Sequence, residues 1–324
     1  MQVRKLQKTS DGTFFTTLPK SWVEKWGMGA GTMLSFFERE DGKIIVSPYG
    51  EVERKIEAAT LTPSPMLERD IEEKYLLGYD VIEIISKEMI EPAVREGVKK
   101  TLKLLVGLEI VEENSKKIVM QCLIEPSLLN PEKILRRLHL ITMAMQKDAF
   151  QSILVGDSKL ASSVVERDEE VDRLYFLLVR LVRAAVSEPS LGEKLSIRPI
   201  DCLDYRLLAS LMESFADHSV ILAESAVGLL DWKRPKRLVE QLDGISGLIH
   251  EMYKDSVGAV LSRDLKFAAR VATKYEEAQL LLKEFEKGVL EGPQNAVERL
   301  TTVIMALSRM CELNVDIADL AIMR

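Results

Sequence analysis

The sequence is poor in cysteine, and its three cysteines stand far apart. Cys122, Cys202 and Cys311 form no Cys-x-x-Cys pair and have no histidine at metal-ligand spacing. A disulfide framework and a zinc site built from cysteines are therefore excluded. We interpret the three residues as buried, reduced thiols, which fits a reducing cytoplasm.

Histidine is equally scarce, and none of the three histidines has a glutamate three residues before it. The Glu-x-x-His pairs that hold di-iron centres in helical bundles are thus missing. No Ser-His-Asp or Cys-His arrangement and no phosphate-binding glycine loop can be recognised either. We therefore expect no enzymatic activity, and a helical-bundle metalloenzyme is the less favoured alternative.

Long apolar runs are missing as well, because charged residues interrupt each of them, as in the run around Arg180 and Arg183. We expect no membrane insertion. No basic leader with an apolar stretch precedes the first pattern, so we expect a cytoplasmic protein. The net charge of −7 argues against broad coating of nucleic acid by the whole protein, but it allows a local basic face.

Acidic residues spaced four apart, within apolar helical stretches, are the most informative feature of the sequence. Val164, Val171 and Tyr175 recur at helical spacing, and Asp168 and Asp172 project from the same side of that helix, one turn apart. Asp168 falls on the apolar seam itself. A carboxylate in such surroundings requires a partner, because an unpaired buried charge costs several kcal/mol.

Two similar acidic pairs follow, Glu213 with Asp217 and Glu312 with Asp316. Carboxylates that leave one face of a helix bind hard divalent or trivalent cations, and iron, Zn, Mg and Mn all remain candidates. A single pair of this kind is more often a solvated face. Three pairs in corresponding helices favour a metal site or an ion-lined groove.

The first fifty residues differ from the rest of the chain. Their pattern predicts strand, turn and strand around Asp11-Gly12, a short helix from Trp22 to Trp26 that ends at Gly27, and two further strands at residues 32–37 and 43–47. A unit of this size buries little surface alone and usually dimerises.

This order of elements, with the phrase Thr17-Leu18-Pro19-Lys20, resembles the AbrB/SpoVT/MazE family of swapped-hairpin proteins. The resemblance implies a β head in which two chains interleave and basic residues of the N-terminal arm contact DNA. Lys and Arg outnumber Asp and Glu by seven to five in residues 1–50. The alternative is a head that only joins two chains. The predicted DNA-binding residues are Arg4, Lys5, Lys8 and Lys20.

Residues 51–128 are expected to form a small α/β connector. A charged stretch and Thr62-Pro63-Ser64-Pro65 predict a linker, followed by a strand at residues 79–85, a helix at residues 91–105 and a hairpin across Asn114-Ser115. No catalytic or phosphate-binding motif occurs in this stretch, so we expect it to serve as a spacer or dimer contact.

From Asn130-Pro131 onward the pattern is almost entirely helical. Six long amphipathic helices predict two tandem three-helix bundles, at residues 129–231 and 232–324, that form an internal repeat. Asp172 then corresponds to Gln279, 107 residues later, and Asp217 corresponds to Asp316, 99 residues later.

The phrase Glu166-Arg167-Asp168-Glu169-Glu170-Val171-Asp172, together with the two later acidic pairs, resembles the PhoU family of phosphate uptake regulators. An AbrB-like head joined to tandem PhoU-like bundles is similar to the archaeal type of these proteins. The resemblance implies a multidomain cytoplasmic protein that restrains phosphate uptake through a transporter and a signalling partner, with metal clusters on the bundle surface.

The second repeat departs from this pattern, because Tyr275 and Gln279 stand where the first repeat has Asp168 and Asp172. A cation would lose half of its carboxylates there. We therefore expect the first site to be competent and the second, Glu312 with Asp316, to be weak or empty.

These patterns predict a dimeric, phosphate-responsive regulator whose head binds DNA and whose bundles contact a transporter or kinase in a metal-dependent way. An adaptor that does not bind DNA is the alternative. An antitoxin with a similar head is disfavoured, because such proteins carry a short disordered tail and this chain continues for about 270 patterned residues.

Overall fold

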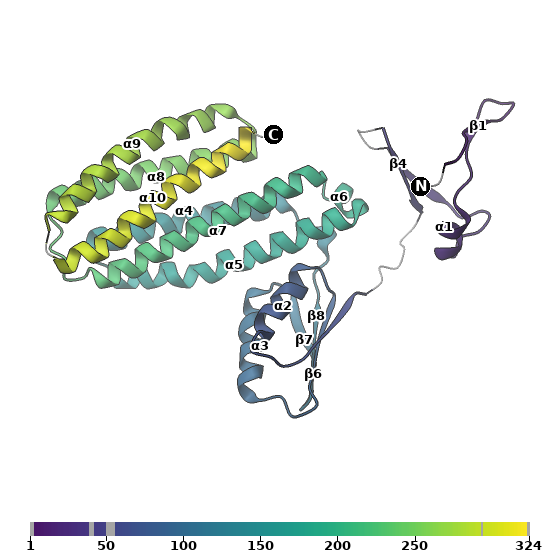
Figure 1. Ribbon diagram of the computed structural model, residues 1–324, viewed down its shortest axis with the longest axis horizontal. Coiled ribbons are helices and arrows are strands. Elements are labelled where there is room, and N and C mark those ends of the chain that lie inside the picture. The colour runs from purple at the N-terminus through teal and green to yellow at the C-terminus, as the bar shows by residue number, and fades with distance from the viewer. Residues whose placement is uncertain (1–2, 39–41, 50–55, 293, 323–324) are drawn as a thin grey trace. The chain divides into compact units, whose positions relative to one another are not determined.

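The computed structural model describes residues 3–38, 42–49, 56–292 and 294–322. The chain divides into two compact units, Met1–Ile56 and Glu57–Arg324. The predicted boundary between residues 50 and 51 lies outside the described residues. The predicted fold class is confirmed, since small N-terminal hairpins, a small α/β module and a large set of helices follow one another along the chain (Figure 1).

Two antiparallel hairpins and one short helix make up the head. β1 (Gln7–Lys8) pairs with β2 (Phe14–Phe15), and β3 (Leu34–Glu38) pairs with β4 (Ile44–Pro48). Between the hairpins lies α1 (Lys20–Lys25), and the chain leaves it through Gly27 at φ +59°. A left-handed glycine after a helix allows the chain to turn without strain.

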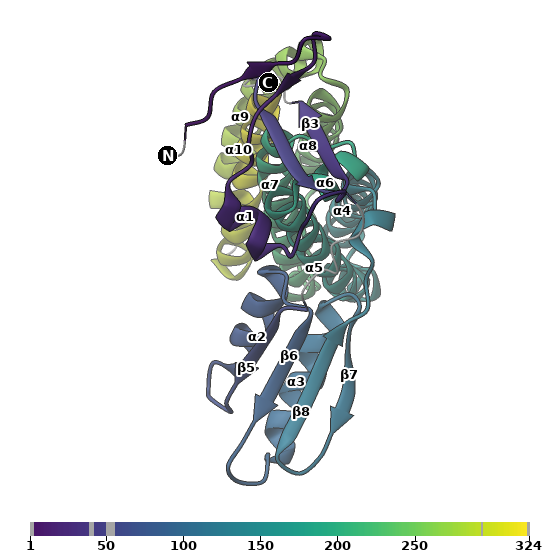
Figure 2. The ribbon, with the colours of Figure 1, turned by 90° about the vertical axis from the view of Figure 1, so that its right-hand side faces the viewer.

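The α/β module contains one four-stranded sheet in the order β5-β6-β8-β7. The first pair of strands is parallel and the other two pairs are antiparallel, and Figure 2 shows the four strands side by side. Side chains from both helices and the sheet form one core, which includes Ile71, Tyr75, Ile82, Ile84 and Val98. The elements are β5 (Ala58–Leu61), α2 (Leu67–Leu76), β6 (Val81–Ile85), α3 (Pro92–Leu104), β7 (Leu108–Glu113) and β8 (Lys117–Cys122).

Two of these elements were not predicted. β5 and α2 flank Thr62-Pro63-Ser64-Pro65, a segment that the sequence analysis interprets as a linker. The two prolines lie in the loop between β5 and α2, so they separate the two elements without disrupting either. Leu67, Ile71 and Tyr75 are the buried residues of α2, and their spacing of four residues is a helical signal in its own right.

The hydrophobic pattern predicts large helices at about residues 132–155, 158–187, 200–231, 235–260, 264–288 and 294–322, and each begins and ends within three residues of these positions. The pattern predicts a loop from Ser187 to Pro199, but the short helix α6 lies within that segment. The helical elements are η1 (Pro126–Leu128), α4 (Pro131–Val155), α5 (Ser158–Ser187), α6 (Pro189–Lys194), α7 (Pro199–Gly228), α8 (Lys236–Ser262), α9 (Leu265–Leu290) and α10 (Gln294–Ile322). Among the described residues, no helix combines the length and apolar character needed to cross a bilayer.

The same turn occurs twice at equivalent places. Gly156 ends α4 at φ +74° and Asp157 then caps α5, while Arg263 ends α8 at φ +56° and Asp264 caps α9. Each aspartate accepts hydrogen bonds from backbone N–H groups in the first turn of its helix, which satisfies donors that the helix leaves free. These pairs are 107 residues apart, as the predicted repeat requires.

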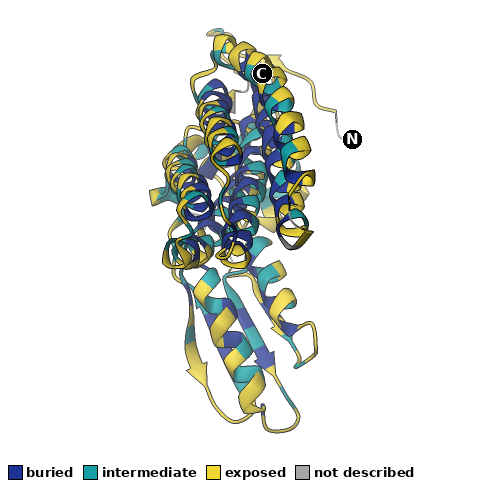
Figure 3. Ribbon diagram, turned by 90° about the vertical axis from the view of Figure 1, so that its left-hand side faces the viewer, coloured by how far each residue is buried: buried dark blue, intermediate teal, exposed yellow. Residues whose placement is uncertain are grey.

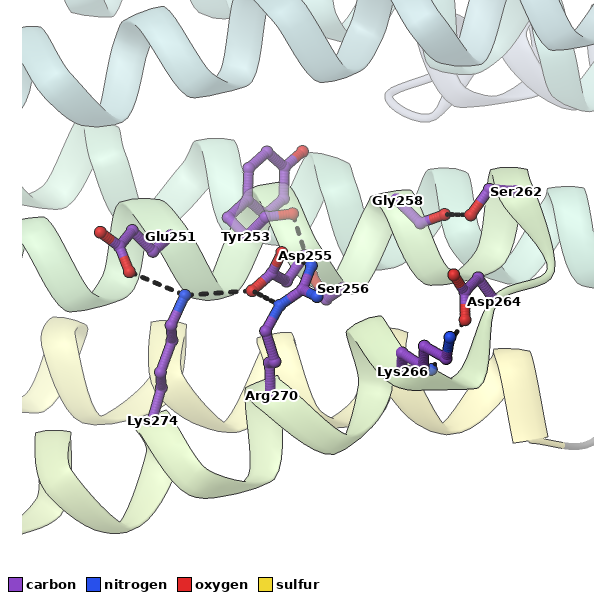
Figure 4. A network of polar contacts seen from close by, with 10 residues as sticks. All are labelled: Glu251, Tyr253, Asp255, Ser256, Gly258, Ser262, Asp264, Lys266, Arg270 and Lys274. Atoms are coloured by element: carbon purple, nitrogen blue, oxygen red, sulfur yellow. Dashed lines mark hydrogen bonds and ion pairs between the residues drawn. The ribbon is translucent and has the colours of Figure 1, made fainter.

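An ion pair between the first two helices of each group also repeats. Arg167 of α5 donates to Asp148 of α4 at 2.6 Å, and Lys274 of α9 donates to Asp255 of α8 at 3.0 Å. Both residues of the second pair lie 107 positions after those of the first. In the second group Arg270 joins the pair, so that two cations from α9 reach Asp255 (Figure 4).

One continuous hydrophobic core runs through both groups of helices (Figure 3). α4 packs against α8, and α7 packs against α10, so the third helices of the two groups lie side by side. The α/β module is attached to α5 through Arg180, which is buried and donates to the carbonyl oxygens of Tyr75 and Gly78 at 2.6 and 3.2 Å. The guanidinium thereby satisfies carbonyls at the end of α2.

Candidate acidic site and basic head

Asp168 and Asp172 lie one turn apart on α5, and both are half-buried. Their positions follow from the apolar face of α5, on which Val164 and Val171 are fully buried. Because Asp168 shares the spacing of these valines, its carboxylate is drawn towards the packed side of the helix. One of its oxygens, Oδ1, is buried without a hydrogen-bond partner.

Glu213 and Asp217 project from α7, the helix that packs along α5. Glu213 is half-buried and Asp217 is exposed. The negative charge of Asp217 raises the pKa values of Asp168, Asp172 and Glu213, so the acids of the two helices influence one another.

The pKa values of these acids lie well above their ordinary range. Burial, followed by the charges of Asp172 and Asp217, raises the pKa of Asp168 to about 7. Burial and then Asp217, Glu72 and Glu169 raise the pKa of Asp172 to about 6. Partial burial also raises the pKa of the Asp217 carboxyl, against the effect of His218.

Glu213 is affected most widely by its neighbours. Burial, followed by the charges of Asp217, Asp172 and Asp168, raises the pKa of Glu213 to about 7, although Arg206 acts in the opposite direction. Like charges held close together favour protonation, and a cation between them relieves the repulsion. The four acids are therefore a group of negative charges without sufficient compensation.

No positively charged group of the described chain pairs with these acids. None of the four side chains forms a hydrogen bond or ion pair within residues 56–292 and 294–322. The donor set and the unpartnered Asp168 oxygen fit a hard cation in chemical terms. As the side chains stand, however, no three of the described His, Cys, Asp and Glu residues converge closely enough to hold one ion directly.

A fifth acid reaches this group from the α/β module. Glu72 of α2 raises the pKa of Asp172, and burial raises the pKa of Glu72 itself. Glu72 is not among the predicted site residues, because it follows the prolines that predict a linker. The helical spacing of Leu67, Ile71 and Tyr75 is the signal that could have placed it.

The second acidic pair is arranged differently. Arg309 of α10 donates to Glu312 at 2.8 Å and lies 3.6 Å from Asp316. Ser210 occupies the position 99 residues earlier, so the first repeat has no such cation. Arg309 is not among the predicted site residues, although its spacing of three residues from Glu312 is a common ion-pair spacing on helices.

The four predicted DNA-binding residues lie in the head, and all are exposed. Lys8 belongs to β1 and lies over the ring of Phe14, Lys20 begins α1 and pairs with Glu24 at 3.6 Å, and Arg4 and Lys5 precede β1. Exposed Lys and Arg side chains can reach phosphate groups, but this arrangement alone does not select DNA.

The described residues of the head form no hydrophobic core of their own. No side chain described in residues 3–38 and 42–49 is buried. Phe14, Trp26, Phe36 and Ile44 expose 62%, 47%, 68% and 61% of their surface. Isolated two-stranded hairpins are marginally stable in water. Apolar exposure of this extent in so small a unit indicates a surface that another molecule covers.

The fold defines a class of protein: a helical-bundle protein with a group of acidic side chains on two neighbouring helices, preceded by a small β head. Comparison with known proteins agrees with this. Residues 135–226 match the PhoU domain, and residues 7–54 match the antidote-toxin recognition domain of MazE, a bacterial antitoxin. The chain therefore carries a PhoU domain that contains all four acids of the first site, preceded by a MazE/AbrB-like domain.

A relative from Aquifex aeolicus (strain VF5), described as a phosphate-specific transport system accessory protein PhoU homolog, is 26% identical over 170 residues. The match covers 51% of this chain and 74% of the relative. The crystal structure of PhoU from Pseudomonas aeruginosa superposes with a TM-score of 0.53 at 17% identity, covering 59% of this chain and 93% of that one. This likeness shows that the helices have the PhoU fold. The phosphate transport system regulatory protein PhoU from Streptococcus pneumoniae gives a TM-score of 0.49 at 15% identity, covering 59% and 91%.

Proposed function

We propose that this protein is a cytoplasmic PhoU-type regulator of phosphate uptake, which acts as an accessory protein of a phosphate transport system. The PhoU domain at residues 135–226 is the observation that supports this most directly. The Aquifex aeolicus relative bears the description of a transport system accessory protein. The role requires partner proteins, a phosphate transporter or a signalling protein, and it requires no catalytic step.

The acidic site is proposed to bind a divalent or trivalent cation. Asp168, Asp172, Glu213 and Asp217 would hold the ion, which would supply the positive charge that this group of carboxylates lacks. The raised pKa values and the unpartnered Asp168 oxygen support the proposal. Since no three of the described ligands converge as placed, binding requires rotation of side chains or ligation through water.

The head is proposed to form a homodimer by interleaving its hairpins with those of a second copy. The exposed aromatic and aliphatic side chains of the head support this, because a second copy would bury them. Pairing two heads would also double the positive face formed by Arg4, Lys5, Lys8 and Lys20. Operator DNA is the ligand that such a face would bind.

Phosphate uptake in cells tests the regulatory role. Cells that lack the gene should take up radiolabelled phosphate without restraint at high external phosphate, and the wild-type gene should restore restraint. Complementation with an Asp168→Ala, Asp172→Ala double variant tests the acidic site in the same assay. Uptake that is unchanged by the deletion would contradict the proposed role.

Two measurements on purified protein test the finer proposals. Elemental analysis should find metal in the full chain and a loss of metal in the Asp168→Ala, Asp172→Ala variant. Gel shift at about 50 mM salt should retain DNA from upstream of phosphate-transport genes, and a Lys5→Glu, Lys8→Glu variant should release it. If no DNA were retained, the DNA-binding proposal would fail and the head would serve only to join two chains.

A further inference from the structure

The outward face of α7 combines an apolar half and an acidic half. We call it the α7 surface. Leu203 and Leu207 expose 64% and 47% of their surface, and Glu213 and Asp217 follow ten residues later. Leu203, Ser210 and Asp217 are spaced by seven residues and therefore follow one line along the helix. The α7 surface consists of Ile200, Leu203, Leu207, Ser210, Glu213 and Asp217.

The exposed apolar half is not required by the packing of α7. The opposite side of the helix provides its core residues, among them Leu208, Met212 and Phe215, which are fully buried. In α10 the positions equivalent to Ile200 and Leu203, 99 residues later, hold Arg299 and Thr302, which are both exposed. The position equivalent to Leu207 holds Ala306, which is buried in the core. The repeat thus tolerates polar residues at the first two positions, and the exposed leucines are particular to α7.

The acidic half has no ion-paired cation of the kind that its counterpart possesses. Arg206, seven residues before Glu213, lies over the ring of Tyr175 and forms no ion pair with Glu213 among the described residues. In α10 a guanidinium of the chain itself, Arg309, occupies the space beside Glu312 and Asp316. In α7 the equivalent residue is Ser210, and Glu213 and Asp217 form no ion pair within the described part of the chain. The second repeat therefore shows that a guanidinium can pair with two acids in this arrangement.

We propose that the α7 surface docks a helical segment of a partner protein, in which apolar residues cover Leu203 and Leu207 and a Lys or Arg reaches Glu213 and Asp217. The two halves are about 15 Å apart, which is ten residues of α-helix at 1.5 Å each. The segment therefore carries its basic residue about three turns from its apolar ones. An amphipathic helix on an apolar surface is a common mode of recognition, and the opposite charges fix its register.

This proposal rests on the partner-dependent role proposed above and assigns that role a site and a partner chemistry. It also defines a relation between the partner and the cation. A metal ion at the four carboxylates and a basic side chain of the partner neutralise the same charges. Binding of one therefore weakens binding of the other.

A photo-crosslinking residue at position 203 of the full chain tests the proposal in cells, with the crosslinked segment mapped by mass spectrometry. The expected segment belongs to another protein and has a Lys or Arg about three turns from its apolar residues. Ser210→Arg should lower the yield at least tenfold, because the new guanidinium can pair with Glu213 and Asp217 as Arg309 pairs with their counterparts. Ser162→Arg, the same change at an exposed position of α5, should leave the yield unchanged.

Four outcomes would overturn the proposal: no crosslink, a crosslink to a second copy or to the head of this chain, an acidic or non-helical segment, or a yield that Ser210→Arg leaves intact. The metal content of the same preparations separates this proposal from the cation site. A protein that binds metal but gives no crosslink retains the cation site and loses the docking surface. A protein that binds no metal but still gives the expected crosslink retains the docking surface and loses the cation site.

Discussion

Arg309 donates a hydrogen bond from Nη1 to Oε2 of Glu312 at 2.8 Å, and its Nη2 lies 3.6 Å from Oδ2 of Asp316. The second acidic pair thus has its counter-charge within the chain. Its helix-two counterparts, Tyr275 and Gln279, carry no charge. The acids of the repeat are thus present in α10, where an arginine of the same helix compensates their charge.

Arg309→Ser should give the second pair a weak affinity for cations. Removal of the guanidinium leaves Glu312 and Asp316 without compensation, so calorimetric titration with Mn²⁺ should detect an additional site with Kd of about 10⁻⁴ to 10⁻³ M. The free energy of unfolding should change by less than about 1 kcal/mol, because the ion pair is partly exposed. Arg299→Ser, the loss of another exposed arginine of α10, is the control and should add no site.

In the metal-free protein, the acids of the first site should lower the free energy of unfolding as pH rises. The pKa values of Asp168 and Glu213 are about 7 in the folded protein, above the ordinary carboxyl values of 3.8 and 4.5. Between about pH 4 and pH 7 the folded state binds more protons at these groups than the unfolded state does. Their contribution to the free energy of unfolding therefore falls as pH rises through this window.

Asp168→Asn isolates this effect. Burial lowers the pKa of His139 to about 4, so His139 destabilises the protein as pH falls below about 6.5 and opposes the carboxylates. The informative quantity is therefore the difference between wild type and Asp168→Asn in thermal melts from pH 5 to pH 8 with chelator. The variant should gain stability relative to wild type as pH rises. A difference that does not vary with pH would rule out a raised pKa at Asp168.

The sequence could predict which acids share a helix face, because helical spacing fixes the direction in which side chains project. Asp168 and Asp172 must share a face of α5, and the spacing also placed Glu213 and Asp217 on one side of α7. It could not supply Glu72, because the contact between α2 and α5 depends on how the α/β module packs. The inserted guanidinium of Arg180, which fixes that packing, has no local signature in the sequence. The distances between the acidic side chains could not be predicted from the sequence either, because they depend on side-chain rotation.

The repeated ion pair between helices should contribute unequally to stability in the two halves. Asp255 is 8% exposed in its side chain and accepts three hydrogen bonds from Arg270 and Lys274. Asp148 is 34% exposed in its side chain, and in the described part of the chain Arg167 is its one ion-pair partner. Asp255→Ala should therefore cost about 3 kcal/mol, and Asp148→Ala less than about 1 kcal/mol. Urea denaturation measures both values, and equal costs would contradict this account of the repeat.

The stabilisation that Asp255 provides should also depend on pH. Burial acts to raise the pKa of Asp255, but the hydrogen bonds from Arg270 and Lys274 outweigh it, so the pKa lies below 3.8. The stabilisation is complete above the ordinary carboxyl pKa and is lost as pH falls through the lowered value. The difference in stability between wild type and Asp255→Ala should therefore stay constant from pH 8 to pH 5 and shrink below about pH 4.

Arg234 should be the most important arginine for the end of the bundle where α4 and α7 finish. It donates to the carbonyl oxygens of Ile153 at 3.0 Å, Trp232 at 2.9 Å and Leu229 at 3.2 Å, and so satisfies acceptors that the helix ends leave free. Its backbone is left-handed, at φ +49°, a conformation that favours glycine. The hydrogen bonds of the side chain therefore explain why an arginine is present there.

Arg234→Gly and Arg263→Gly form a matched pair that separates these two effects. Both arginines are left-handed, with Arg263 at φ +56°, so glycine relieves a similar backbone cost at each position. Among the described residues, the exposed side chain of Arg263 has one ion-pair partner, Asp201, at 3.3 Å. Arg234→Gly should lower the free energy of unfolding by about 2 kcal/mol, and Arg263→Gly should leave it within about 0.5 kcal/mol of wild type in urea denaturation. If the two variants lost stability equally, backbone conformation rather than capping of the helix ends would account for the arginine at position 234.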